Sequence, residues 1–183
     1  QMLSLAASRL GFRVHIFAPD SNPPAARVSE YHMQAGYEDL DAVLEFANGV
    51  DVVTYEFENV PSNTAKAAQA GALLYPGAEA LRVAQDRLVE KTFISTEANV
   101  AVTPFQDVTS VFELKRICKR LGLPLVLKTR RFGYDGKGQV IIRSEADIEE
   151  AYAKMKDAPA IAEAFIPFKR EVSVVAARNA QGE

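Results

Sequence analysis

The first 76 residues alternate between helix-like and strand-like segments, and a glycine follows each predicted helix. The helix-like segments 2–10, 40–47 and 64–70 are followed by Gly11, Gly49 and Gly71, and then by the strand-like segments 13–18, 50–55 and 72–75. Glycine often ends a helix because it adopts left-handed backbone angles at little cost. Helices and strands that alternate over short connections are typical of a parallel sheet covered by helices. We therefore predict a small doubly wound parallel-sheet α/β domain over residues 1–76.

The pattern changes after this domain. Residues 77–100 show helical periodicity without a strand, with Leu81, Ala84 and Leu88 on one face, so we predict a helical connector. From 101 to 183 we expect an α+β domain with antiparallel strands. Its predicted strands are 125–128, 139–143, 160–165 and 171–177, and its predicted helices begin after Ser110 and Ser144.

Composition and charge exclude several classes of partner. The 21 Lys and Arg residues are balanced by 24 Asp and Glu residues, and no block of basic residues occurs. Nucleic acids and anionic membrane surfaces attract basic clusters, so neither is an expected partner. The apolar runs also fall short of the ~20 residues that span a bilayer. We expect a cytoplasmic protein.

The single cysteine, Cys118, lies in an apolar stripe with Leu114, Ile117 and Leu121 at helical spacing. This position favours a core residue over a nucleophile. One cysteine and two histidines are also too few for an intrachain disulfide or a Cys/His zinc site. No metal ligand is predicted from these residues.

The strongest local signal is a glycine-rich loop between two strand-like runs. It contains Gly133, Gly136 and Gly138, with the cations Lys128, Arg130, Arg131 and Lys137 around them. Glycines free backbone N–H groups to wrap an anion, so we predict a phosphate-binding loop. Gln139 follows the last glycine and no helix begins there, which excludes a Walker A loop. The alternative is an ordinary glycine-rich hairpin.

Three charged residues interrupt the strands of this second domain. Lys128 ends an apolar strand, where its ammonium either reaches solvent or faces a ligand such as a phosphate. Glu163 and Glu171 either lie on a solvated face or help to bind a nucleotide. In the second case, the backbone of 163–166 would meet an adenine edge and Glu171 would accept hydrogen bonds from a ribose.

In the first domain, polar residues follow the strand-like segment 50–55. Glu56, Glu58 and Asn59 come where that strand ends, and ligands of open α/β sheets bind at the carboxyl ends of strands. They could bind the hydroxyls of a sugar or an amine. The alternative is that they are loop polars and helix caps.

Five segments together resemble a known family. They are 54–61, Ala84-Gln85-Asp86-Arg87-Leu88, 126–131, 133–139 and 165–174. In these residues the chain resembles the N5-carboxyaminoimidazole ribonucleotide synthetases, ATP-grasp enzymes of purine synthesis. The resemblance covers essentially the whole chain. It identifies residues 101–183 as the N-terminal part of an ATP-grasp domain.

The resemblance implies a reaction and a set of site residues. ATP, bicarbonate and 5-aminoimidazole ribonucleotide would give N5-carboxyaminoimidazole ribonucleotide, ADP and phosphate. Lys128, Tyr134 and Asp135 would be catalytic, and Glu56, Tyr134 and Asp135 would meet the ribonucleotide. The nucleotide would be bound by Arg87, Lys128, Gly133, Tyr134, Asp135, Gly136, Lys137, Gly138, Gln139, Glu163, Ala164, Phe165, Ile166 and Glu171.

The chain also departs from the family pattern. Family members begin with a strand and a glycine-rich turn and continue past residue 183 through residues that hold Mg²⁺. We therefore expect a fragment truncated at both ends, inactive alone, whose Mg²⁺ ligands lie beyond residue 183. The resemblance also implies a homodimer for the full-length protein.

Two alternatives remain open from the sequence. The chain could belong to another ATP-grasp ligase or carboxylase, such as a glycinamide ribonucleotide synthetase or a biotin carboxylase. It could instead be a nucleotide-binding regulatory module that has lost its chemistry.

Overall fold

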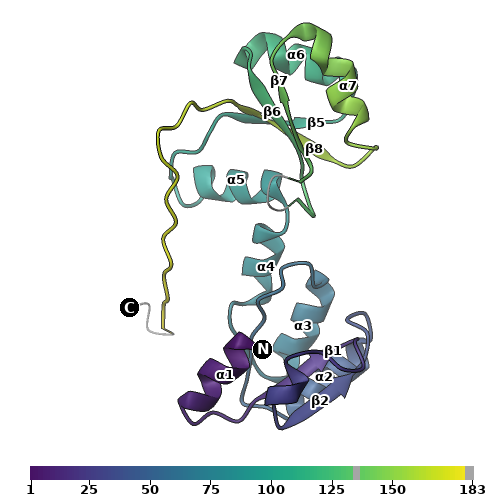
Figure 1. Ribbon diagram of the computed structural model, residues 1–183, viewed down its shortest axis with the longest axis vertical. Helices are drawn as coiled ribbons and strands as arrows, with labels where there is room; N and C mark the ends of the chain where they lie inside the picture. The colour runs from purple at the N-terminus through teal and green to yellow at the C-terminus, as the bar shows by residue number, and fades with distance from the viewer. Residues whose placement is uncertain (134–136, 180–183) are drawn as a thin grey trace. The chain divides into compact units, whose positions relative to one another are not determined.

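The computed structural model describes residues 1–133 and 137–179 and divides the chain into two compact units (Figure 1). The first unit contains residues 1–101 and the short segment Arg130–Phe132. The second contains residues 102–129 and the chain from Gly133 onward. Within the described ranges, no helix is long and apolar enough to cross a membrane.

The first unit alternates helices and strands as expected. Its elements are α1 (Met2–Arg9), β1 (His15–Ala18), a 3₁₀ turn (Ala26–Val28), β2 (Tyr31–Gln34), α2 (Leu40–Asn48), β3 (Val52–Val53), α3 (Ser62–Gly71), β4 (Leu73–Leu74), α4 (Ala78–Ala84) and α5 (Arg87–Thr96). The strands pair in parallel, β1 with β2 and β3 with β4, which confirms the predicted parallel arrangement. They form two separate two-stranded sheets. Strand β2 was not predicted; its Tyr-His-Met-Gln sequence does alternate apolar and polar side chains, but only over four residues.

An apolar groove of about 870 Å³ lies in this unit. It is lined by residues of α1, β1 and β3, with Val43 and Phe46 of α2 among the others. The expectation that this domain lacks a first strand stays a prediction.

Glycine ends two of these helices in different ways. Gly11 follows α1 with φ +84°, the left-handed conformation expected of it. Gly71, the last residue of α3, is needed for close packing instead, because a Cβ there would lie 2.8 Å from the Cβ of Ala47 on α2. The two helices therefore pack tightly over the core of the unit, which consists of Val43, Ala47, Val60, Ala65, Ala68, Leu74, Ala78 and Leu81.

The predicted connector is not one helix. It is broken at Gln85 and Asp86 into α4 and α5. Asp86 has extended backbone angles, and its side chain accepts hydrogen bonds from the N–H groups of Leu88 and Val89, which makes it the N-cap of α5. The apolar periodicity of this segment continues through the break, so periodicity alone could not reveal it.

The second unit has one antiparallel sheet. Its elements are β5 (Phe105–Val108), α6 (Val111–Leu121), β6 (Leu125–Thr129), β7 (Gln139–Ile142), a 3₁₀ turn (Glu145–Asp147), α7 (Ile148–Ala153) and β8 (Ala160–Ala164). The strand order is β5-β8-β6-β7, and every neighbouring pair is antiparallel, as predicted. Ser110 caps α6, and Ser144 forms a capping box with Asp147, also as predicted. Strand β5 was not predicted.

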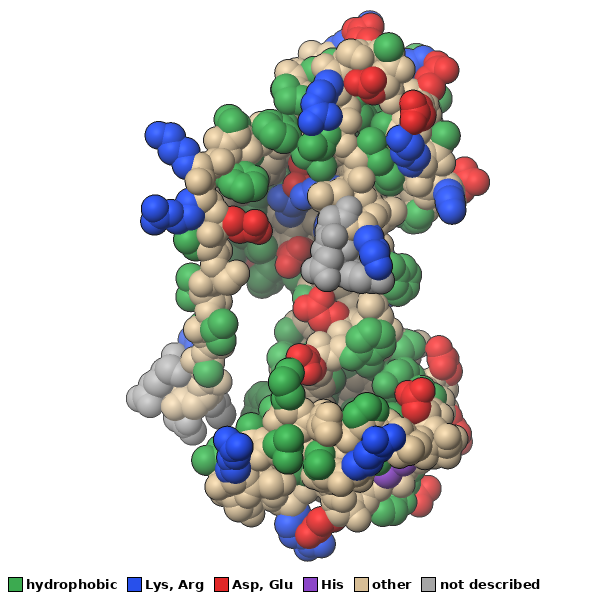
Figure 2. Space-filling view, in the orientation of Figure 1, with side chains coloured by type: hydrophobic (Ala, Val, Ile, Leu, Met, Phe, Trp, Pro, Cys, Tyr) green, Lys and Arg blue, Asp and Glu red, His purple; other side chains and the backbone are tan. Residues whose placement is uncertain are grey.

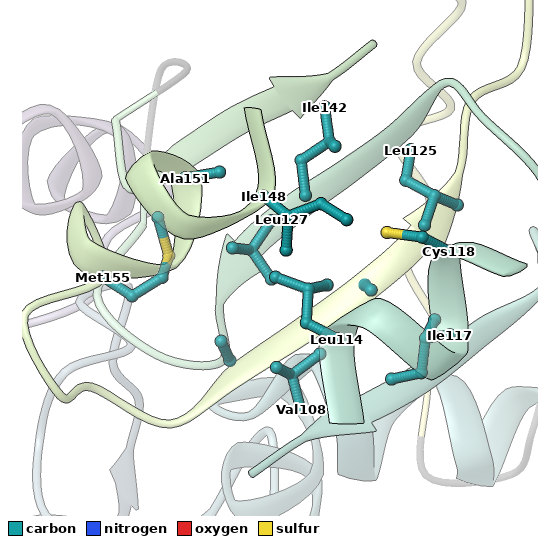
Figure 3. Packing of buried hydrophobic residues seen from close by; sticks show 12 residues of the cluster. Val108, Leu114, Ile117, Cys118, Leu125, Leu127, Ile142, Ile148, Ala151 and Met155 are labelled. Carbon is teal, nitrogen blue, oxygen red and sulfur yellow. The ribbon is translucent and has the colours of Figure 1, made fainter. Parts of the chain in front are cut away.

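Helices α6 and α7 pack on one face of this sheet and enclose its core (Figure 3). Leu114 and Cys118 extend from α6 toward Leu125 and Leu127 of β6, and Ile117 belongs to the same buried cluster. The cysteine is buried, which confirms that it is a core residue.

The predicted strand 171–177 is wrong. Residues 171–177 form no strand or helix, and Val172, Val174 and Val175 are largely exposed. Alternating β-branched residues favour an extended backbone, but a strand also needs a hydrogen-bonded neighbour. Within residues 137–179, no strand pairs with this segment.

Candidate functional site

Lys128 and Glu163 form an ion pair inside the sheet of the second unit. Val126 of β6 is directly opposite Glu163 of β8, so Lys128, two residues along β6, lies diagonally across on the same face. The Lys128 Nζ is 2.9 Å from the Glu163 Oε2. The two side chains are 24% and 7% exposed. The solvated-face interpretation of Glu163 is therefore wrong, because sheet pairing turns its carboxylate toward a cation in a mostly enclosed position.

Placing an ion pair in a mostly enclosed position costs hydration free energy, so we treat its surroundings as a candidate binding site. Two charges withdrawn from water lose hydration that their mutual attraction only partly returns. A partly enclosed ion pair can stabilise the fold or belong to a binding site. An ammonium at the end of β6 can contact an anionic ligand as a point charge.

In the segment that follows Glu163, two backbone N–H groups are already hydrogen-bonded within the protein, whereas two apolar side chains are partly exposed. The backbone N–H of Ala164 donates to Pro104 O at 2.9 Å, and that of Phe165 donates to Pro124 O at 3.2 Å. The side chains of Phe165 and Ile166 are about half exposed. The predicted adenine contact at 163–166 would thus use these apolar side chains and the remaining backbone groups.

The glycine-rich loop joins β6 to β7 as a hairpin. Its base is closed where the Thr129 N–H donates to Gly138 O at 2.8 Å, and Lys128 is opposite Gln139 in the antiparallel register. Gly138 has φ +71°, and a Cβ there would lie 2.6 Å from the Thr129 Oγ1. Gly138 is therefore required by the hairpin itself, whatever the loop binds.

The structure describes only some of the predicted loop residues. Gly133, Lys137, Gly138 and Gln139 belong to the described chain, whereas Tyr134, Asp135 and Gly136 lie outside the described residues. Their phosphate and ribonucleotide contacts stay predictions. Glu171 is exposed in a segment without secondary structure, and the structure does not bring it to Lys128 or Glu163 by any hydrogen bond within the described residues.

A second cluster lies in the first unit, around the break between α4 and α5. The guanidinium of Arg130 grips Asp86 with two nitrogens: Nε is 3.0 Å from Oδ1, and Nη2 is 2.6 Å from Oδ2. The backbone N–H of Arg87 donates to Arg130 O at 2.9 Å. Burial raises the pKa of Asp86, but hydrogen bonds from Arg130 and from two backbone N–H groups outweigh this, so its pKa lies below the ordinary value.

Gln85 connects the same cluster to the loop after β3. Its amide nitrogen donates to the carbonyl oxygens of both Glu58 and Val60, and its amide oxygen accepts from Arg131 Nη2 at 3.1 Å. Glu56 and Glu58 are exposed on that loop, where the sequence predicted polar ligands.

Sequence reasoning assigned no role to Gln85 or Asp86, and it counted Arg130 only among the cations around the glycine-rich loop, although all three fall in segments that it singled out. The signal that could have found them is an acidic residue directly before Arg87 and a basic one directly after the strand of Lys128. Elsewhere, Lys and Arg side chains are interspersed with Asp and Glu over the visible face, and no basic stripe is seen there (Figure 2).

Comparison with known proteins agrees with this architecture. Residues 1–85 match the family model of the ribonucleotide synthetase preATP-grasp domain, and residues 93–183 match that of the ATP-grasp domain. The N5-carboxyaminoimidazole ribonucleotide synthase of Brucella melitensis is 42% identical over 184 residues, which cover 100% of this chain and 51% of that protein.

Solved structures are similar over the same range. The ADP complex of an N5-carboxyaminoimidazole ribonucleotide synthetase has a TM-score of 0.92 at 39% identity, and covers 100% of this chain and 48% of that one. The Aspergillus clavatus N5-carboxyaminoimidazole synthase, in complex with ADP and 5-aminoimidazole ribonucleotide, has a TM-score of 0.81 at 28% identity over 92% of this chain and 44% of that one. The chain spans about half the length of the curated synthases it matches. By sequence and by fold, it belongs to the ATP-grasp family of N5-carboxyaminoimidazole ribonucleotide synthases.

Proposed function

We propose that the protein uses ATP to carboxylate 5-aminoimidazole ribonucleotide with bicarbonate, giving N5-carboxyaminoimidazole ribonucleotide, ADP and phosphate in purine synthesis. The observation that carries the proposal is the enclosed Lys128–Glu163 pair at the base of a glycine-rich hairpin. The names of its relatives and the ADP and ribonucleotide complex of the Aspergillus clavatus protein support the choice of reaction. The same names favour it over the glycinamide ribonucleotide synthetase and biotin carboxylase alternatives.

The chemistry needs an activated carboxyl group because bicarbonate is a poor electrophile. A bicarbonate oxygen attacks the γ-phosphorus of ATP, the bond to the β–γ bridging oxygen breaks, and ADP leaves carboxyphosphate behind. The amine nitrogen of the ribonucleotide then attacks the carboxyl carbon, either in carboxyphosphate or in CO₂ released from it. The carbon–oxygen bond to phosphate breaks and the nitrogen loses a proton.

The protein's part in phosphoryl transfer is to position the reactants and to stabilise charge on oxygens. We assign Lys128 and Arg87 to the nucleotide phosphates, together with the hairpin residues 133–139. Residues 163–166 would receive the adenine and Glu171 the ribose of ATP. Tyr134, Asp135 and Glu56 would meet the aminoimidazole ribonucleotide.

We further propose that Mg²⁺ accompanies ATP, that the protein is cytoplasmic and that it acts as a homodimer. Mg²⁺ prefers carboxylate and phosphate oxygens. Within 1–133 and 137–179, no group of three or more His, Cys, Asp or Glu side chains could hold a metal ion, so no ligand for it is assigned on this chain.

The test is ATP hydrolysis with bicarbonate and Mg²⁺, with and without 5-aminoimidazole ribonucleotide, by the protein at the full length of its relatives. We expect the ribonucleotide to stimulate phosphate release, and Lys128→Ala to abolish that stimulation. Lys115→Ala is the matched control, because it removes a lysine whose ion pair with Glu149 is exposed. Hydrolysis that is indifferent to the ribonucleotide would contradict the proposed reaction.

A further inference from the structure

We propose that Gln85 and Asp86, at the break between α4 and α5, are positioning residues with separate tasks. Asp86 holds Arg87 in place for the phosphates of ATP, and Gln85 holds the loop of Glu56 in place for the ribonucleotide. This inference rests on the proposed function. It concerns contacts that all lie within the first unit.

Asp86 acts on its neighbours in two ways at once. Its carboxylate caps α5 through the N–H groups of Leu88 and Val89, which sets the direction in which that helix begins. The same carboxylate receives the guanidinium fork of Arg130. A bidentate pair of this kind fixes orientation as well as distance.

Arg87 is the first residue of α5, so its backbone is held from both sides. The cap on Asp86 fixes the preceding residue, and the Arg87 N–H is bonded to Arg130 O. The side chain of Arg130 thus holds Asp86 while its carbonyl holds the next residue, Arg87. Loss of the ion pair would therefore remove one of the two contacts that position this pair of residues, without removing the charge of Arg87.

Gln85 performs the corresponding task for the loop after β3. One side-chain amide bonds to two carbonyls of the loop, at Glu58 and Val60, and Val60 is buried in the core of the unit. These bonds bracket the chain just beyond Glu56 and limit where its carboxylate can go. The bond from Arg131 to the amide oxygen keeps the amide in the orientation that donates to the loop.

Variants that keep the size of each side chain but remove one interaction can distinguish these positioning tasks from a general contribution to stability. Asp86→Asn keeps a good helix cap but removes the charge that Arg130 grips. Gln85→Glu keeps the size and the acceptor for Arg131 but cannot donate to the loop carbonyls. Glu79→Gln is the control, because it breaks a similar two-pronged pair with Arg82 on the exposed side of α4.

The experiment measures KM for ATP and for 5-aminoimidazole ribonucleotide in the protein at the full length of its relatives, with binding of adenosine as a third readout. We expect Asp86→Asn to raise KM for ATP about tenfold, because a misplaced Arg87 no longer contacts the phosphates of ATP. KM for the ribonucleotide and the binding of adenosine, which has no phosphates, should be unchanged. We expect Gln85→Glu to raise KM for the ribonucleotide and to leave KM for ATP and the binding of adenosine unchanged. Glu79→Gln should change neither.

A crossed pattern of this kind is not produced by general weakening of the fold. Equal rises in both KM values in either variant, or no change relative to Glu79→Gln, would overturn the inference. If Asp86→Asn does not fold, Arg130→Lys tests the same pair by keeping the charge and removing the fork, and it should raise KM for ATP alone. If the unsubstituted protein shows no ribonucleotide-dependent turnover, the proposed function fails, and the inference falls with it.

Discussion

At the scale of single residues, the Lys128–Glu163 pair depends on sheet register. Each residue interrupts an apolar strand, and each could have faced water. A shift of either strand by one residue would turn its charge to the opposite face and leave the other unpaired. The register that puts Val126 opposite Glu163 makes the two charges neighbours.

Glu163→Gln is expected to destabilise the protein by about 1–3 kcal/mol, since it leaves the mostly enclosed Lys128 ammonium without its counter-ion. The measurement is urea unfolding followed by circular dichroism. Glu149→Gln, which breaks the exposed pair with Lys115, should have no measurable effect. Equal stability of the two variants would show that the enclosed pair contributes no more than a surface pair.

The Asp86–Arg130 pair predicts a dependence of stability on pH. Because the folded-state pKa of Asp86 is depressed, its contribution is present above its unfolded pKa of about 3.9 and is lost as pH falls through the lower folded value. The difference in unfolding free energy between the unsubstituted protein and Asp86→Asn should therefore be largest near pH 6 and shrink near pH 3. Arg130→Gln should show the same trend, and a difference independent of pH would contradict the assignment.

At the scale of elements, two glycines next to a helix or a strand have positive φ angles for different reasons. Gly122 ends α6 with φ +81° and has nothing within 4 Å of a would-be Cβ. Gly138 has φ +71°, and a Cβ there would lie 2.6 Å from the Thr129 Oγ1. The hairpin that carries the predicted phosphate loop is therefore shaped by local packing as well as by backbone freedom.

Gly122→Ala is expected to cost roughly 1–3 kcal/mol, because φ +81° with ψ 168° is a backbone region that essentially only glycine adopts, and Gly138→Ala is expected to add a steric clash to the strain of its own positive φ. The additional cost comes from the contact with Thr129 Oγ1, so a second change, Thr129→Ala, should recover part of it in Gly138→Ala and none of it in Gly122→Ala. Thermal unfolding of the two variants and their doubles measures this. No recovery of stability by Thr129→Ala in Gly138→Ala would mean that the hairpin accommodates the methyl group.

At the scale of the whole molecule, the two units have separate hydrophobic cores. Leu81 belongs to the core of the first unit, and Leu114 to that of the second. Each side chain is almost completely buried. Proteins with more than one core do not have to unfold in a single transition.

Leu114→Ala is expected to cost about 2–5 kcal/mol and to weaken hydrogen-exchange protection in residues 105–164 while leaving residues 40–96 unchanged. Leu81→Ala should give the opposite pattern. Hydrogen exchange read by mass spectrometry distinguishes the two. Loss of protection in both units from either change would show that they unfold as one.

The sequence by itself determined the features that depend on short-range chemistry. These features are the glycines after α1 and α6, the serine before α6 and the apolar spacing in α6. Each acts over a few residues, so the neighbouring sequence is enough to predict it. The parallel and antiparallel character of the two domains follows from the same local alternation. Motif resemblance pointed to the family for the same reason.

Only the tertiary structure decided which distant residues meet. Asp86 and Arg130 are 44 positions apart, Lys128 and Glu163 are 35 apart, and neither pairing has a local signal. The same limit made the predicted strand 171–177 wrong, since β-propensity is local and strand pairing is not. Partner choice depends on register, helix breaks and chain path together, and those are set only when the cores assemble.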